Sequence, residues 1–368
     1  TLVGRLALDH RLQREGCFFI RGPVHDEVAH NLHVGKRVDL DPGRCFFPTG
    51  QRRLAIDRNT AHPTTLDATE PAVADFQPAV LDGVIENIEH AHILFVRPGD
   101  RVLPRRALGR RIEAIDNGSI EFAHAEDLAL GSLLTEGIHV RITGQDTERG
   151  TFSQRHLVLH DEKTGIKYAP IQHLDDSKAP FELHNSPLSE IACLGFEYGY
   201  ASSDDNSLVI WEAQFGDFAN SGQVIIDSFL ASGESKWGLT SRMTLLLPHG
   251  HEGAGPEHSS ARIERFLSLA AEGNMRIANP STAAQYFHLL RRQALIKKPR
   301  PLVVFTPKGM LRQPAATSTL EQLTDSHFHF ILDDPSATER RDKVERLVLC
   351  PAASTTTSTE PTSAPTPG

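Results

Sequence analysis

The chain has 368 residues, of which 39% are hydrophobic and 23% charged, and its formal net charge is −9. This length allows one large domain or two modest ones, and the acidic balance does not favour nucleic acid as a partner. No apolar run approaches the roughly 20 residues that span a bilayer, and the first residues resemble neither a signal peptide nor a basic transit segment. We therefore expect an ordinary globular protein with no nucleic-acid or membrane partner.

Four cysteines without any Cys-x-x-Cys pair are spread along the chain: Cys17, Cys45, Cys193 and Cys350. Their spacing argues against a zinc ribbon or a disulfide scaffold and is typical of a reducing compartment. We therefore predict a cytoplasmic location.

Composition divides the chain into three regions. Residues 1–78 are rich in Arg and His, with Pro and Gly interrupting every apolar run, whereas residues 115–313 alternate helix and strand patterns. Residues 351–368 are a low-complexity stretch of Ser, Thr and Pro, which we expect to be a disordered tail.

The middle region contains five segments of each kind. Helical periodicity predicts Ala123–Thr135, Ser189–Ala201, Ala219–Ala231, Glu257–Ala271 and Thr282–Leu295. Short apolar runs predict the strands Ile138–Thr143, Leu208–Glu212, Thr244–Leu247, Met275–Ala278 and Leu302–Phe305. Strands that alternate with longer helices indicate β-α-β units, so we predict an α/β fold with an open, mostly parallel, twisted sheet and helices on both faces.

Three loops that follow expected strands contain polar and aromatic residues. Gly-Gln-Asp follows Thr143, Glu-Ala-Gln-Phe-Gly-Asp-Phe follows Trp211, and a loop rich in His and Gly follows Leu247. Because ligands bind beyond the carboxyl ends of parallel strands, these loops predict one binding site at a single edge of the sheet.

Glu190 opens one of the predicted helices, with Ser189 before it as a suitable cap. The helix dipole favours an acid in the first turn, and this alone could account for the residue. The functional alternative is a carboxyl group in a dry pocket that shares a proton with the ring nitrogen of a bound aminopyrimidine.

The aromatic residues after Trp211 also allow two interpretations. Phe215 and Phe218 could be core residues, as aromatic side chains at helix starts usually are. A pocket for an aminopyrimidine also needs a flat aromatic ring, for which we choose Phe218, and Gln214 could both donate and accept hydrogen bonds at the edge of the ligand ring.

Three histidines, His249, His251 and His258, lie in the loop after Leu247. They could bind a metal, but no Cys or second acidic ligand has suitable spacing, so we predict no metal site. We favour an open loop in which His258 donates a hydrogen bond to an anionic substrate oxygen at a helix start.

Seven ordered blocks of sequence lie in the middle region, at residues 140–156, 196–200, 211–220, 232–237, 246–265, 289–293 and 306–312. Together they resemble the pyrimidine-binding, transketolase-like central domain of the thiamine-diphosphate-dependent decarboxylase component of 2-oxoglutarate dehydrogenase. The resemblance covers about residues 115–350.

The resemblance implies specific roles. Glu190 would be the activating acid, Gln214 and Phe218 would face the aminopyrimidine of thiamine diphosphate, and His258 would contact the 2-oxo acid. The implied reaction is decarboxylation of 2-oxoglutarate in the tricarboxylic acid cycle, followed by transfer of the succinyl unit to a lipoyl group on a partner acyltransferase. Arg292 matches one contact of an acetyl-coenzyme A site in some relatives, but other positions of that site do not match.

The resemblance also implies a partner. The family binds the diphosphate and Mg²⁺ through a separate domain that carries Gly-Asp-Gly, and this sequence has no Gly-Asp-Gly. We therefore expect this chain to supply the pyrimidine side of the site, to need a diphosphate-binding domain or subunit for activity, and to be oligomeric.

On this basis we divide the chain into five parts. Residues 1–78 match no part of the family that we can identify, 79–114 form a linker or helical lead-in, and 115–330 form the pyrimidine-binding domain. Residues 331–350 would begin a truncated further domain, before the tail at 351–368. The alternatives are a catalytically silent remnant or assembly module of such a complex, and a relative specific for 2-oxoadipate.

Overall fold

The computed structural model describes residues 18–21, residues 110–334 except 112, 162, 175, 253 and 254, and residues 344 and 346–349. The chain divides into two units, Thr1–Pro71 with Ile331–Pro351 and Ala72–Phe330 with Ala352–Gly368. None of the helices within the described residues has the length and apolar character needed to cross a membrane. The predictions for the tail and for most of residues 1–114 lie outside the described residues.

The larger unit is built on a sheet of six strands, all parallel, in the order β5-β2-β6-β7-β9-β8. Their bounds are β2 Val140–Gly144, β5 Phe181–Asn185, β6 Leu208–Glu212, β7 Thr244–His249, β8 Arg276–Ala278 and β9 Leu302–Pro307. The predicted α/β fold with an open parallel sheet is therefore confirmed.

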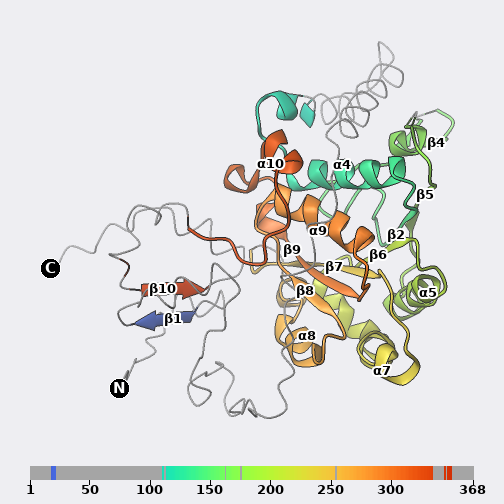
Figure 1. Cartoon of the computed structure of the whole chain (residues 1–368). Coiled ribbons are helices and arrows are strands. Elements are labelled where there is room, and N and C mark those ends of the chain that lie inside the picture. Colours follow the sequence, from blue (N-terminus) through green and yellow to red (C-terminus); the bar gives the residue numbers. More distant parts are fainter. Residues whose placement is uncertain are drawn as a thin grey trace. The chain divides into compact units, whose positions relative to one another are not determined.

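Helices cover both faces of this sheet (Figure 1). On one face, α4 (Phe122–Thr135) packs along α9 (Ala283–Leu295), with α10 (Leu320–Thr324) beside α9. On the other face lie α5 (Glu190–Ser203) and α8 (Ile263–Leu269). The helices predicted at Ala123–Thr135, Ser189–Ala201 and Thr282–Leu295 are confirmed within one or two residues at each end.

Successive residues of the central strands belong to two different cores. In β6, Leu208 and Ile210 pack under α4 and α9, whereas Val209 and Trp211 pack against α5. Because side chains alternate across a strand, a strand with helices on both faces must be apolar at every position. All five residues of β6 are buried, including Glu212 at its end.

The strand β5 was not predicted. It lies at one edge of the sheet, beside β2, with Phe181 and Leu183 buried while His184 is exposed. An edge strand with one polar face has no continuous apolar run, so the pattern that reveals the central strands is missing here. The small hairpin of β3 (Leu159–His160) and β4 (Lys167–Tyr168) was also not predicted.

The helix predicted at Ala219–Ala231 is wrong as one continuous helix. The chain forms a 3₁₀-helix, η3 (Gly216–Gly222), then one turn of α-helix, α6 (Gln223–Ile225), and a π-helix, η4 (Ile226–Leu230). Gly222 is packed so closely that a Cβ there would lie 2.9 Å from the Leu194 side chain. The fit of this segment against α5 therefore dominates over the helical preference of its sequence.

The helix predicted at Glu257–Ala271 is wrong in its first half. Pro256–His258 is a 3₁₀ turn, η5, and only Ile263–Leu269 is α-helical. Arg262 interrupts the segment in a left-handed conformation (φ 57°) while its guanidinium donates to Asp217 Oδ1 at 2.7 Å. That tertiary ion pair has no signature in the local sequence.

Further short helices connect these elements: η2 (Pro170–His173), α7 (Gly233–Trp237), η6 (Lys308–Met310) and η7 (Pro314–Ala316). In the other unit, β1 (Phe18–Arg21) pairs antiparallel with β10 (Arg346–Leu349). Nothing in the local sequence indicates this pairing between segments more than 300 residues apart.

Candidate active site

The carboxyl ends of the central strands meet at one edge of the sheet, as predicted. Gly144 is in register with Glu212, Glu212 with Leu246, and Pro248 with Thr306. Gly144 is needed here, because a Cβ at this position would lie 2.4 Å from the carbonyl oxygen of Glu212. The segments that leave β2 and β6 therefore begin in direct backbone contact.

Glu190 is the first residue of α5, directly beyond the edge strand β5. Its side chain is half-buried and accepts a hydrogen bond at Oε1 from Gln145 Nε2 at 2.6 Å. Ser189 occupies the N-cap position in an extended conformation, but its side chain makes no capping hydrogen bond. A direct amide donor fixes the carboxyl group more firmly than the dipole of a helix end can, since that effect is diffuse.

Gln214 lies just beyond β6, and its Nε2 donates to Asp146 Oδ2 at 3.3 Å. Asp146 also forms an exposed ion pair with Arg149 at 3.3 Å. Gln214 and Glu190 are thus both held by neighbouring residues of the same segment, residues 145–155, which we name loop L2.

Phe218 and His258 are brought together through Phe215. The ring of Phe215 lies 4.2 Å from the ring of His258 and 5.6 Å from that of Phe218, and Phe218 lies 5.7 Å from His258. Phe152 of loop L2 meets Phe215 edge-on at 5.7 Å. The structure therefore joins loop L2 to the segment at residues 250–262, which we name loop L7.

No hydrogen bond or ring contact within the described residues joins Glu190 directly to Phe218 or His258. They are connected by η3, which carries Phe218 and packs on α5, with Gly222 against the start of that helix. The functional roles of Glu190, Gln214, Phe218 and His258 remain predictions.

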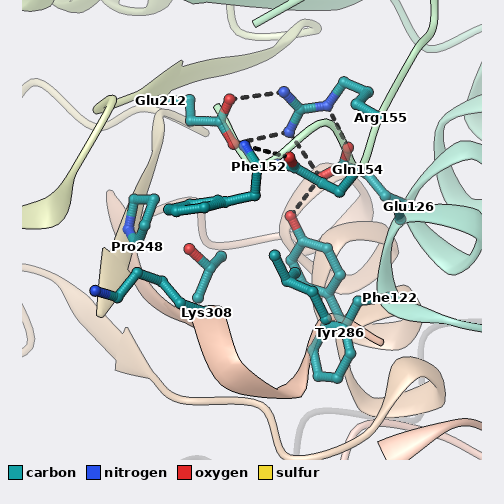
Figure 2. A pocket seen from close by; sticks show the side chains of 12 residues that line it. Phe122, Glu126, Phe152, Gln154, Arg155, Glu212, Pro248, Tyr286 and Lys308 are labelled. Atoms are coloured by element: carbon teal, nitrogen blue, oxygen red, sulfur yellow. Dashed lines mark hydrogen bonds and ion pairs between the residues drawn. The ribbon is translucent and has the colours of Figure 1, made fainter. Parts of the chain in front are cut away.

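Loop L2 is anchored by a buried group of charges that the sequence patterns did not indicate. Arg155 has 1% of its surface exposed and donates to both carboxyl oxygens of Glu126 and of Glu212, at 2.5–3.2 Å (Figure 2). Tyr286 donates to Glu126 at 2.6 Å, and Thr147 donates to Glu212 at 3.0 Å. This Arg155 network connects α4, β6 and α9 to the loop.

The electrostatics of the Arg155 network hold the guanidinium in its charged form. Burial alone would lower the pKa of Arg155, but the carboxylates of Glu126 and Glu212 outweigh it and hold the pKa well above its usual value. Burial, and then the charge of Glu126, also raise the pKa of the Tyr286 hydroxyl well above its usual value. Arg155 therefore stays charged and Tyr286 keeps its proton across the neutral range.

A small cavity lies next to this network (Figure 2). Its walls are mainly apolar and aromatic, and its polar lining includes the network and one amine: Phe122, Ala123, Glu126, Phe152, Gln154, Arg155, Glu212, Pro248, Tyr286, Thr306, Lys308 and Leu311. Phe152 and Lys308 of this lining also lie beside Phe215.

Loop L7 is held by different contacts. His249, the last residue of β7, accepts a hydrogen bond at Nδ1 from the backbone N–H of Ala261 at 3.1 Å. Burial, followed by the nearby charges of His251 and Lys308, lowers the pKa of His249 to about 4. Lys308 donates from Nζ to the carbonyl oxygen of His258 at 2.6 Å.

The described residues contain no group of three or more His, Cys, Asp or Glu side chains arranged to hold a metal ion. His249 and His251 have their rings 5.7 Å apart. Nδ1 of His249 accepts a backbone hydrogen bond, so holding the loop accounts for this residue.

The fold and the site define a class of domain, namely an open parallel α/β domain that presents an acid, an amide and aromatic rings at one sheet edge. Residues 118–314 match the family described as transketolase, pyrimidine binding domain, and this match covers more than half of the chain. The chain belongs to this family.

Curated relatives agree with the resemblance found in the sequence. The chain is 55% identical over 249 residues to the 2-oxoglutarate dehydrogenase E1 component of Geobacillus sp. (strain WCH70), covering 67% of this chain and 26% of that protein. It is 52% identical over 334 residues to the protein of the same name from Bacillus subtilis (strain 168), covering 89% and 35%.

A third relative is the multifunctional 2-oxoglutarate metabolism enzyme of Mycobacterium sp. (strain JLS), 48% identical over 306 residues, with 80% of this chain and 24% of that protein covered. The chain thus spans about a quarter to a third of the length of these relatives. The predicted resemblance is confirmed.

Proposed function

We propose that this chain forms the pyrimidine side of a thiamine diphosphate site in an enzyme that decarboxylates 2-oxoglutarate. The observation that carries the proposal is the contact between Glu190 and Gln145, at a sheet edge that also presents Gln214, Phe218 and His258. The substrate class follows from the names of the relatives.

The side chains at this edge fit an aminopyrimidine in their chemistry. A pyrimidine has flat apolar faces and polar edges, which suit the ring of Phe218 and the side chains of Gln214 and Glu190. When bound, thiamine diphosphate would supply the carbanionic nucleophile that attacks a 2-oxo carbonyl and the electron sink that lets carbon dioxide leave.

Glu190 would hold and move the proton on the aminopyrimidine nitrogen. Its Oε1 is occupied by the Gln145 amide, whereas Oε2 makes no hydrogen bond within the described residues. Gln145 therefore leaves one carboxyl oxygen available to the ring nitrogen and fixes its direction. A positioned acid of this kind contributes about 10²- to 10⁴-fold to a rate.

His258 would donate a hydrogen bond to the oxo acid. Phe215 and Phe218 flank its ring and exclude water on those sides, which strengthens any hydrogen bond it makes. The aromatic group therefore holds the donor and lowers the local dielectric at the same time.

The diphosphate and Mg²⁺ would be held by a separate diphosphate-binding domain or subunit, since no Gly-Asp-Gly occurs in these 368 residues. We further propose that the acyl unit passes to a lipoyl-carrying acyltransferase, that the enzyme is oligomeric, and that it acts in the cytoplasm. Two alternatives are a domain without turnover and a preference for 2-oxoadipate, and the experiments that follow distinguish them from the proposal.

The test is to replace Glu190 in the full-length protein, with its diphosphate-binding partner, thiamine diphosphate and Mg²⁺. Glu190→Gln should lower the rate of 2-oxoglutarate decarboxylation about 10²- to 10⁴-fold while the circular dichroism spectrum is unchanged. Glu190→Asp, which keeps the acid, should retain part of the rate.

A matched control is Glu321→Gln, because Glu321 is an exposed first-turn acid of α10. If Glu190 acted only through the helix dipole, the two substitutions would have similar, small effects. Wild-type protein that is inactive with every partner and every 2-oxo acid would favour the silent domain. A higher kcat/KM for 2-oxoadipate than for 2-oxoglutarate would favour the other substrate.

A further inference from the structure

Five cationic side chains of the described residues lie around the candidate site, of which three pair with carboxylates and a fourth donates to two backbone carbonyl oxygens. Arg155 binds Glu126 and Glu212, Arg149 pairs with Asp146, and Arg262 pairs with Asp217. Arg312 donates to the backbone carbonyl oxygens of Phe152 and Ser153 at 3.1 and 2.8 Å. The fifth is Lys308.

Within the described residues, Lys308 differs from the other four in having a single, neutral hydrogen-bond acceptor. Its ammonium group donates to one neutral acceptor, the His258 carbonyl oxygen, and lies 6.0 Å from the centre of the Phe215 ring. Among the described residues no carboxylate lies within ion-pair distance (4.0 Å) of its Nζ. Its three N–H donors are therefore not all used.

The surroundings of Lys308 are poor for an isolated positive charge. It is half-buried, it lines the cavity beside Phe152 and Pro248, and burial lowers its pKa although Glu252 acts in the opposite direction. An anion that entered this site would gain a desolvated partner, and the charged form of Lys308 would be stabilised in return.

Lys308 also contacts the residue that carries the candidate substrate donor. Its Nζ is 2.6 Å from the backbone oxygen of His258, and the His258 ring lies on Phe215, which Lys308 also faces. In an extended 2-oxo dicarboxylate of five carbons, about 4 Å separate the oxo carbon from the distal carboxyl carbon. Because the His258 ring and the Lys308 amine both lie beside Phe215, a substrate with its oxo group at His258 would extend its distal carboxylate along this aromatic ring towards Lys308.

We propose that Lys308 binds the distal carboxylate of the substrate and selects dicarboxylic over monocarboxylic 2-oxo acids. This inference rests on the proposed function and adds a specificity residue to the same site. Lys308, on η6, would thus recognise the end of the substrate that does not react.

The test compares two substrates in the full-length protein assembled with its diphosphate-binding partner. 2-Oxoglutarate carries the distal carboxylate, and 2-oxovalerate has the same carbon skeleton without it. Lys308→Met should lower kcat/KM for 2-oxoglutarate about 10- to 100-fold, the value of one hydrogen bond to a charged group, and change that for 2-oxovalerate by less than about threefold.

Further variants separate the effect of the Lys308 charge from that of its hydrogen bond to the His258 carbonyl oxygen. Lys308→Gln keeps an amide donor but not the charge, so it should lose the discrimination as Lys308→Met does. Lys308→Arg, which keeps the charge, should retain most of the discrimination between the two substrates. Arg312→Met removes a cation from the same edge and should affect both substrates equally.

A second measurement needs no turnover. An amine-reactive reagent should modify Lys308 in the assembled protein, and glutarate, but not butyrate, should protect it, as measured by peptide mass spectrometry. Equal losses for both substrates in Lys308→Met, or equal protection by the two acids, would overturn the inference. Wild-type protein that decarboxylates neither acid would instead contradict the proposed function.

Discussion

Loops L2 and L7 meet at the same sheet edge, but the charges that hold them there differ in burial. Loop L2 is anchored by buried ions, since the Arg155 guanidinium lies between two carboxylates. Loop L7 is held by two hydrogen bonds that each use one backbone group, from Lys308 Nζ to the His258 carbonyl and from the Ala261 N–H to His249 Nδ1, and by the partly exposed ion pair of Arg262 with Asp217. The side of the site that would handle the cofactor proton is thus rigid, whereas the side that would meet the substrate depends on a few replaceable contacts.

The largest expected effect concerns the anchor of loop L2. Arg155→Met leaves Glu126 and Glu212 buried without a counter-charge, so it should lower the free energy of unfolding by about 3 to 5 kcal/mol. Urea denaturation followed by circular dichroism measures this. Arg149→Met, on the same loop but in an exposed ion pair, should change it by less than about 1 kcal/mol. Similar values for the two variants would contradict the contrast between anchored and exposed charges.

A smaller effect is expected at loop L7, where the free energy of unfolding should depend on pH through His249. The pKa of His249 is about 4 in the folded protein against an ordinary value of 6.5, so the unfolded chain binds more protons between these values. Stability is therefore lost as the pH falls from 6.5 towards 4, and at pH 5 the loss should be about 2 kcal/mol. Protonation would also remove the acceptor that Ala261 uses.

The control for this effect is His249→Asn, whose side-chain oxygen can accept a hydrogen bond but does not titrate. Unfolding free energies at pH 7 and pH 5 should differ by about 2 kcal/mol less in the variant than in the wild type. An unchanged difference would mean that the acid sensitivity arises elsewhere, for example at His124. That histidine is buried on α4, where burial and then the charge of Arg111 lower its pKa to about 3.

The smallest effect is expected when Gln145 of loop L2 is replaced, and it tests whether this loop orients Glu190. Gln145→Ala removes the donor to Glu190 while Arg155 still anchors the loop, so the stability should barely change. The rate of decarboxylation should fall about tenfold, corresponding to one hydrogen bond to a charged group. Gln145→Glu, which offers no amide donor, should fall at least as far. A variant with full activity would show that Glu190 needs no orientation by Gln145.

Much of the fold could be predicted from sequence because the central elements have strong local patterns. Leu208–Trp211 is a continuous apolar run and Ala283–Leu295 has a clear helical period, so β6 and α9 were both found. The errors lie where contacts distant in sequence determine the backbone. Gly222 against Leu194 and Arg262 against Asp217 break two predicted helices, and neither partner can be identified from neighbouring residues.

The site shows the same division. The four candidate residues could be proposed from sequence because each follows a strand or starts a helix at the expected edge. Gln145, Arg155 and Lys308 were given no role, because their partners lie 45, 57 and 50 residues away. Loop sequence can show that a residue lies at the edge, but not which distant carboxylate or carbonyl it will meet.

The contact between Gly144 and the Glu212 carbonyl oxygen has a consequence for anyone who changes this protein. The candidate chemistry depends on a hydrogen atom at position 144, where even a methyl group would force β2 and β6 apart at their ends. Gln145 and Asp146 would then move away from Glu190 and Gln214 together, so a single added carbon would uncouple two polar contacts at once. Libraries of variants built on this scaffold should leave that position untouched, however far it lies from any reacting atom.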